Sequence, residues 1–172
     1  MNDRLKTIVD LNKYPIHNLN SPNIKNLIKK CKKELDEFSC STIPNFILPK
    51  SLEIMKLELE KKLDEVYMSK ESINAYLYAK DDMTLPKDHP KRIFMSRYNG
   101  YLNSNCFKKD SEMKYLYETE ELLKFISACL GISPIFRWAD PLACHAYNVM
   151  KPKGILPWHF DSCEFTLSLM IQ

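Results

Sequence analysis

A chain of 172 residues, 45% of them hydrophobic, is long enough to bury one sizeable core and does not call for two independent domains. Its 25 basic and 22 acidic residues leave a formal charge of +3, and no basic block interleaved with aromatic residues indicates nucleic-acid binding. The N-terminus shows no apolar signal sequence, and no apolar run reaches the roughly 18 residues of a membrane span, so we expect a cytoplasmic protein that does not enter the membrane.

Helical spacing of apolar residues predicts a first helix over residues 21–39. Ser21 can cap its N-terminus, and Pro22 suits its first turn because the N–H group that proline lacks has no helical partner there. The apolar residues share one face, which we expect to point into the core. They are Ile24, Leu27, Ile28, Cys31, Leu35 and Phe38.

Two further helices are predicted downstream. One runs from a Thr119 cap to Gly131, with Leu122, Ile126, Cys129 and Leu130 on one face. The proline-bounded residues 41–51, which follow the first helix, are expected to form a strand or a packed connection. Residues 80–93, which lie after the middle helix, are expected to form a polar loop. For that loop, a solvated turn is favoured over a substrate-contacting role. The middle helix is indicated by Leu52, Met55, Leu59, Leu63 and Val66.

The apolar pattern changes from helical spacing to alternation after residue 131. Strands are expected over residues 135–139, 143–151 and 164–172, which are short and rich in β-branched and aromatic residues. In the last of them Phe165, Leu167, Leu169 and Ile171 would share one face. Helices followed by strands predict an α+β fold in a single domain, mainly helical with some strands over residues 1–131.

The six cysteines form no CxxC pair. Without an export signal, we expect free thiols in a reducing compartment, several of them filling core positions. Their spacing lacks the short knuckle of a zinc site, so a structural zinc ion is disfavoured. The cysteines are Cys31, Cys40, Cys106, Cys129, Cys144 and Cys163.

His159 and Asp161 are the strongest candidates for a metal site. Residues two apart on an extended segment point to the same side, so the imidazole and the carboxylate can converge on one ion. Two histidines and one carboxylate form the facial triad of non-haem Fe(II) oxygenases, and they leave open positions for a bidentate 2-oxo acid and for O2. His-x-Asp is short enough to occur by chance, and a surface turn is the simpler interpretation of the pair alone.

The surrounding sequence is more specific than the pair. The stretch "DPLACHAYNVMKPKGILPWHFDSCEFTLSLMIQ", residues 140–172, resembles the Fe(II)/2-oxoglutarate-dependent oxygenases related to the free-amino-acid halogenases and hydroxylases. The segments "VDLNKYPI", "CKKELDEF", "IPNFILP", "LPKDHPKR" and "LLKFISACLGI" follow the order expected for the N-terminal helical half of that group. The resemblance thus covers nearly the whole chain.

The resemblance implies a fold, cofactors and metal ligands. It implies a double-stranded β-helix, also called a jelly roll and cupin-like, of which residues 132–172 would be the start. It implies Fe(II), the cosubstrate 2-oxoglutarate and O2, with His159 as the first iron ligand and Asp161 as the carboxylate ligand. Halogenating members carry Gly or Ala at the carboxylate position, so Asp161 implies a hydroxylase. The implied substrate is a small molecule, such as a free amino acid of which lysine is the best-associated example.

Other residues near the pair carry weaker predictions. Tyr147 and Asn148 could contact 2-oxoglutarate or the substrate, although ordinary strand residues with hydrogen-bond partners are favoured. Trp158 is expected to shield one side of the site. His145 is disfavoured as third ligand, because in the family the second histidine comes from a later strand. Two arginines, Arg92 and Arg97, could pair with a substrate carboxylate.

A working triad would need a distal histidine and a basic anchor for 2-oxoglutarate, and the residues after Asp161 contain no His, Arg or Lys. We therefore expect residues 1–172 to be the N-terminal part of a longer oxygenase domain. The sequence is also compatible with a homo-oligomer. Two alternatives stay open. One is a non-catalytic remnant or an interaction protein that pairs its last strand with another chain; the other is a cupin-like metal binder that does not consume 2-oxoglutarate.

Overall fold

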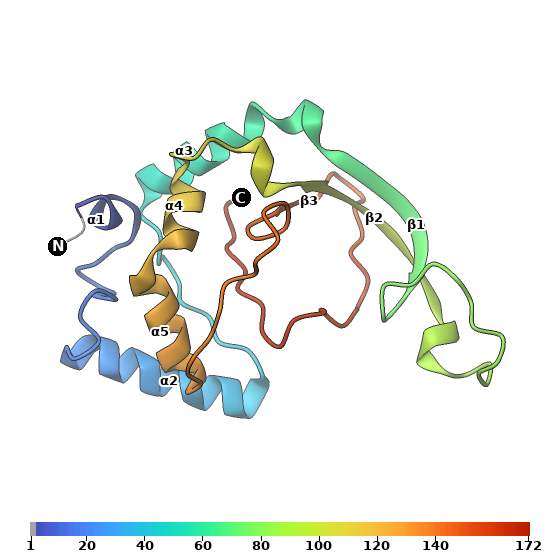
Figure 1. Cartoon of the computed structure of the whole chain (residues 1–172), viewed down its shortest axis with the longest axis horizontal. Helices are drawn as coiled ribbons and strands as arrows, with labels where there is room; N and C mark the ends of the chain where they lie inside the picture. Colours follow the sequence, from blue (N-terminus) through green and yellow to red (C-terminus); the bar gives the residue numbers. More distant parts are fainter. Residues whose placement is uncertain (1–2) are drawn as a thin grey trace.

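The computed structural model describes residues 3–172 and shows an α+β protein with five α-helices and one three-stranded antiparallel sheet (Figure 1). The predicted α+β class is confirmed. The helices are α1 (Leu5–Ile8), α2 (Pro22–Phe38), α3 (Pro49–Glu60), α4 (Glu112–Glu118) and α5 (Glu120–Leu130). The strands are β1 (Tyr67–Asn74), β2 (Phe94–Leu102) and β3 (Tyr147–Val149), and single 3-10 turns are η1 (Leu63–Glu65), η2 (Pro90–Arg92) and η3 (Ser104–Cys106).

The ends of α2 and α5 follow the local signals in the sequence. The Ser21 hydroxyl accepts a hydrogen bond from the Ile24 N–H at 3.4 Å, as predicted for an N-cap. Gly131 ends α5 with a φ of 72°, a left-handed conformation that glycine adopts without steric strain. Thr119 precedes α5, but its hydroxyl donates to the Leu116 carbonyl at 2.8 Å instead of capping α5.

The predicted apolar faces needed two corrections. Phe38 is 71% exposed, because it lies in the last turn of α2 beyond the packing partners of that helix. The helix predicted through Val66 ends at Glu60, and Leu63 lies in η1 with 46% of its surface exposed. The chain leaves the helix there because β1 begins at Tyr67 and its backbone groups pair with β2 instead.

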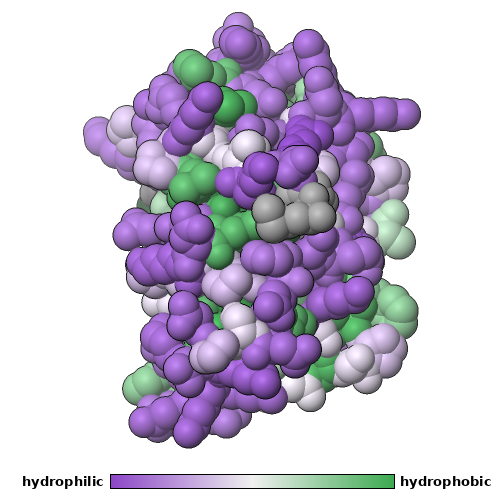
Figure 2. Space-filling view, turned by 90° about the vertical axis from the view of Figure 1, so that its left-hand side faces the viewer, coloured by the Kyte–Doolittle hydropathy of each residue, from purple (hydrophilic) through white to green (hydrophobic). Residues whose placement is uncertain are grey.

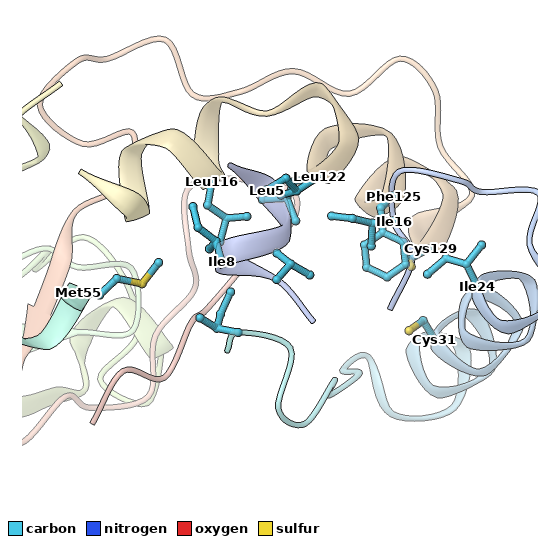
Figure 3. Close-up of a cluster of buried hydrophobic side chains, with 12 residues drawn as sticks. Leu5, Ile8, Ile16, Ile24, Cys31, Met55, Leu116, Leu122, Phe125 and Cys129 are labelled. Atoms are coloured by element: carbon cyan, nitrogen blue, oxygen red, sulfur yellow. The ribbon is translucent and has the colours of Figure 1, made fainter. Parts of the chain in front are cut away.

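One buried apolar cluster, here called the helical core, joins all five helices (Figure 3). The four-residue helix α1, which periodicity did not predict, lies near its middle because Leu5 and Ile8 are fully buried. Residues 41–51 prove to be mainly a packed connection, with a single bridge between Val9 and Ile47. The cluster consists of Leu5, Ile8, Val9, Ile16, Ile24, Cys31, Ile47, Met55, Leu116, Leu122, Phe125 and Cys129.

The outer face of this helical region is mostly hydrophilic, with small separate hydrophobic patches (Figure 2). This agrees with an arrangement in which the apolar faces of the helices turn inward. In residues 3–172 no helix is both long and apolar enough to cross a membrane.

The sheet comes mainly from a part of the sequence with no clear periodicity. Strand β1 pairs over its whole length with β2, from Tyr67 opposite Tyr101 to Asn74 opposite Phe94, and β3 adds to the other edge of β2. The predicted polar loop, residues 80–93, lies within the connection between β1 and β2.

Most of the strands predicted after residue 131 do not form. Residues 135–139 and 164–172 contain no strand, and residues 143–151 contain only β3. The alternation in residues 164–172 is expressed in part, since Leu169 and Ile171 pack against buried residues while Leu167 is 63% exposed. Alternation predicts which face of a strand is buried, but a strand forms only where a neighbour pairs with its backbone, and none lies along these residues in the described chain. The sheet is therefore not a closed barrel.

Candidate functional site

The segment that carries the predicted ligands is attached to the sheet at two points. Ile155 forms a bridge with Tyr98 of β2, and both of its backbone hydrogen bonds are 2.8 Å long. Further on, the Phe160 N–H donates to the Ala75 carbonyl, just after β1, at 2.9 Å. The backbone between His159 and Asp161 is thus held by the end of the β1 strand.

The side chain of Phe160 strengthens this attachment. Its ring packs against Tyr76 with a centroid separation of 5.2 Å and meets the Trp158 ring edge-on at 4.5 Å. Neighbouring residues of an extended chain point to opposite sides, so anchoring Phe160 turns His159 and Asp161 the other way. Trp158 remains 64% exposed, so within these residues it shields one side of the pair only partly.

His159 and Asp161, here called the dyad, do converge. The His159 Nε2 atom lies 3.3 Å from the Asp161 Oδ1 atom. The His159 Nδ1 atom lies 2.8 Å from the Pro157 carbonyl, which can only accept, so we assign the imidazole proton to Nδ1. The Thr166 hydroxyl donates to the Asp161 Oδ2 atom at 2.6 Å and leaves Oδ1 facing the imidazole.

This geometry fits two neighbouring ligands of one metal ion. At metal–ligand distances of about 2.1 Å, ligand atoms at right angles lie about 3 Å apart, close to the separation of Nε2 and Oδ1. A ligating histidine usually donates its other N–H to a carbonyl or carboxylate, as His159 does to Pro157. The same distance also suits a direct hydrogen bond between a protonated His159 and Asp161.

A third ligand does not join them. Among residues 3–172, no group of three or more His, Cys, Asp or Glu side chains is arranged to hold a metal ion. His145 lies instead beside Cys144, with Nδ1 3.1 Å from the sulfur, and its ring packs against Tyr117 at 5.5 Å. Its Nε2 atom is buried without a partner in the described part of the chain, and burial lowers the pKa of the imidazole.

Asn148 and Tyr147, the predicted contacts of 2-oxoglutarate or substrate, point to opposite faces of β3. The Asn148 side chain accepts a hydrogen bond from Asn99 at 2.8 Å. Tyr147 is 6% exposed and packs against Phe107 at 4.5 Å, with its hydroxyl unpartnered among the described residues. Burial raises the pKa of that hydroxyl. The two side chains therefore cannot both face one small ligand while they are neighbours in this strand.

Both arginines proposed to bind a substrate carboxylate are engaged within the chain. Arg92 forms a two-pronged pair with Asp81 at 2.9 and 3.0 Å, which lowers the pKa of that carboxyl group. Arg97 donates to Asn99 at 2.7 Å and to Glu71 at 3.3 Å. Either guanidinium would have to give up these partners to bind a ligand.

Sequence reasoning missed the residue that organises the end of β1. Asn74 is 1% exposed, and its side chain donates to the Lys91 carbonyl at 2.6 Å. Its oxygen accepts from the Tyr76 and Tyr78 N–H groups at 2.9 and 3.2 Å, which fixes the turn that holds Phe160. Asparagine is favoured at such turns because its side chain bonds to backbone groups a few residues on, so this signal was present in the sequence.

A comparison with models of known protein families finds no match, and a comparison with curated proteins finds no significant similarity. The assignment of a function therefore depends on the dyad and on the motifs around it.

Proposed function

We propose that this chain is part of a non-haem Fe(II)/2-oxoglutarate-dependent dioxygenase that hydroxylates a small, amino-acid-like substrate. The observation that carries the proposal is the 3.3 Å approach of His159 Nε2 to Asp161 Oδ1, made by a segment whose sequence resembles that family. The contact between the Trp158 and Phe160 rings supports the proposal indirectly, because it holds the backbone from which His159 and Asp161 project.

Each residue of the dyad has a distinct part in the proposal. His159 offers the Nε2 lone pair, and the Pro157 carbonyl holds the ring in the required tautomer and orientation. Asp161 supplies one negative charge, and the Thr166 hydroxyl orients its carboxylate. Bound iron, with 2-oxoglutarate and O2, would supply the oxidising power to break an unactivated C–H bond.

The proposal extends to the fold. The sheet β1-β2-β3, the segment through the dyad and residues 164–172 would belong to a double-stranded β-helix. Residues 164–172 would become a strand once another strand lies beside them, because their backbone groups would then find partners. The third iron ligand and the anchor for 2-oxoglutarate would come from polypeptide other than residues 3–172.

A metal titration tests the proposal on this chain. We expect Mn(II), a stable substitute for Fe(II), to bind to the wild type and to lose at least about tenfold in affinity in His159→Ala and Asp161→Asn. His145→Ala is the matched control and should bind like the wild type. Equal binding by all four proteins would contradict the dyad as a metal site.

The intact mass of the polypeptide in its native source shows which assay follows. A mass above that of the 172-residue chain leads to turnover of 2-oxoglutarate to succinate, which should require Fe(II) and fail in His159→Ala. Because Asp161 occupies the position that is Gly or Ala in halogenating relatives, chloride or bromide should give no halogenated product. A chlorinated product by mass spectrometry would refute the hydroxylase assignment.

A strand-pairing interaction protein is a second candidate, and one observation favours it. Residues 164–172 carry exposed apolar side chains, including Met170 at 81% and Leu167 at 63%, without a paired backbone in the described chain. Size-exclusion chromatography separates the candidates. A complex that persists in His159→Ala but dissociates when Leu167 becomes Pro would favour strand pairing.

A further inference from the structure

Two cysteines far apart in the sequence face each other inside the helical core. Cys31 lies on α2 and Cys129 on α5, and they are 2% and 8% exposed. Figure 3 shows their side chains pointing toward one another from the two helices. Both residues are free thiols, and they belong to the same buried cluster.

The surroundings of the two sulfurs are unequal. The pKa of the Cys31 thiol is lowered, mainly by the neighbouring Cys129 thiol and further by Ser41 and the Lys30 ammonium, which outweigh the opposing effect of burial. The pKa of Cys129 is raised by the neighbouring Cys31 and by the burial of its own charge. The pair therefore favours one thiolate beside one thiol.

We propose that Cys31 and Cys129 form an oxidative modification site, where hydrogen peroxide converts the two thiols into a disulfide that links α2 to α5. The two helices already pack against each other, and the two thiols face one another within the same buried cluster, so the bond requires little movement of the backbone. The site lies in the helical core and does not depend on the metal dyad or on the proposed oxygenase activity.

The chemistry balances with peroxide as the oxidant. The Cys31 thiolate attacks one oxygen of H2O2, the O–O bond breaks, and the hydroxide that leaves takes up a proton to give water and a Cys31 sulfenic acid. The Cys129 sulfur then attacks the Cys31 sulfur and loses its proton, and the hydroxyl group leaves with that proton as a second water. Burial of both thiols favours a small uncharged oxidant over a larger disulfide such as oxidised glutathione.

The bond would stabilise the helical region. It closes a long loop of chain and so restricts the unfolded state, which predicts a rise in melting temperature of roughly 5–15 °C on oxidation. A reductant should reverse the rise. Such a link would make the stability of this region respond to the redox state around the protein.

The test treats the full chain, native and reduced, with H2O2 in a variant in which Cys40, Cys106, Cys144 and Cys163 are Ser. We expect the intact mass to fall by about 2 Da, the loss of two hydrogen atoms, and non-reducing peptide mapping to find Cys31 linked to Cys129. Adding Cys31→Ser or Cys129→Ser should abolish both the mass loss and the rise in melting temperature. Mapping of the wild type gives the same answer if the four-serine variant does not fold.

Three outcomes would overturn the proposal. Oxygen addition of about 16 or 32 Da without a disulfide would show that Cys129 does not reach the oxidised sulfur. Linkage of Cys31 to another cysteine in the wild type would show that the observed pairing is not the reactive one. Lack of reaction in the native protein, where the urea-unfolded protein does react, would show that the two thiols only fill the core.

Discussion

The helical region, residues 5–60 and 112–131, buries most of its large apolar side chains, whereas the sheet region, residues 67–107 and 132–172, leaves many of them exposed. The helical region buries them in one continuous cluster in which Leu5, Ile8 and Met55 have no exposed surface. The sheet region has a much smaller cluster of Leu102, Phe107 and Tyr147, while other large apolar side chains stay exposed, including Phe136 at 83%. The helical region therefore has the larger continuous core, whereas residues 132–172 leave many large apolar side chains exposed.

Polar contacts take a larger share in the sheet region. One face of the sheet holds a connected network in which Arg97 bonds to Glu71 and Asn99, and Asn99 bonds to Asn148. Asn99 is fully buried and both ends of its amide are satisfied. Such a network specifies strand register, because a slip by one residue would leave its buried groups unpaired.

Removal of one phenylalanine from each region should give the largest contrast. Phe125→Ala, in the helical core at 2% exposure, should lower the free energy of unfolding by about 3–5 kcal/mol. Phe136→Ala, at 83% exposure, should change it by less than about 0.5 kcal/mol. Urea denaturation of both variants measures the difference, and similar losses would mean that residues 132–172 pack more tightly than the structure shows.

Asn74→Ala should separate stability from metal binding in the sheet region. The substitution removes three hydrogen bonds and should lower the free energy of unfolding by about 2 kcal/mol. Since the turn that Asn74 fixes holds Phe160, affinity for Mn(II) at the dyad should also fall by about tenfold. Asn18→Ala, at an exposed turn, is the control. An unchanged affinity in a folded Asn74→Ala protein would show that the turn does not position the dyad.

Replacing one glycine in each region by alanine compares how tightly side chains pack around that position. A Cβ at Gly100 in β2 would lie 2.5 Å from Val66 Cγ1 and 2.7 Å from Met68 Sδ, so Gly100→Ala should cost about 1–2 kcal/mol by overpacking. A Cβ at Gly131 would make only an ordinary contact, 3.6 Å from the Lys32 side chain, but the φ of 72° disfavours a side chain, so Gly131→Ala should cost about 1 kcal/mol. Thermal denaturation compares the two, and a neutral Gly100→Ala would indicate that the sheet is loosely packed around the central strand β2.

The smallest expected effect is the pH dependence that His145 contributes. Burial is the main cause of its lowered pKa in the folded state, with Lys114 acting in the same direction and Glu118 against it. Above the ordinary value of 6.5 the imidazole is neutral in both states, and as the pH falls below it the unfolded state binds the proton more readily, so stability is lost. Between about pH 7.5 and about pH 5, the wild type should therefore lose slightly more stability than His145→Gln, as measured by urea denaturation. Equal losses in the two proteins would mean that His145 has the same pKa in the folded and unfolded states.

The two helices with the clearest end signals, α2 and α5, were predictable, while α1, α4 and much of the sheet were not, for a physical reason. The cap at Ser21 and the stop at Gly131 act within a few residues, so α2 and α5 could be identified from local sequence. The pairing of β1 with β2 depends on residues some distance along the chain, and neither strand alternates cleanly because both faces carry polar side chains. The clean alternation in residues 164–172 predicted a strand that does not form, because no other strand of the described chain lies beside these residues to pair with their backbone.

The sequence by itself determined the α+β class, the boundaries of the strongest helices and the pairing of His159 with Asp161, because two residues in an extended segment share a side whatever surrounds them. Only the tertiary structure decided what holds that pair, through the turn at Asn74 and the anchored Phe160. It also decided that Cys31 and Cys129 meet. Contacts between distant segments depend on how helices and strands pack, and no local pattern encodes that packing.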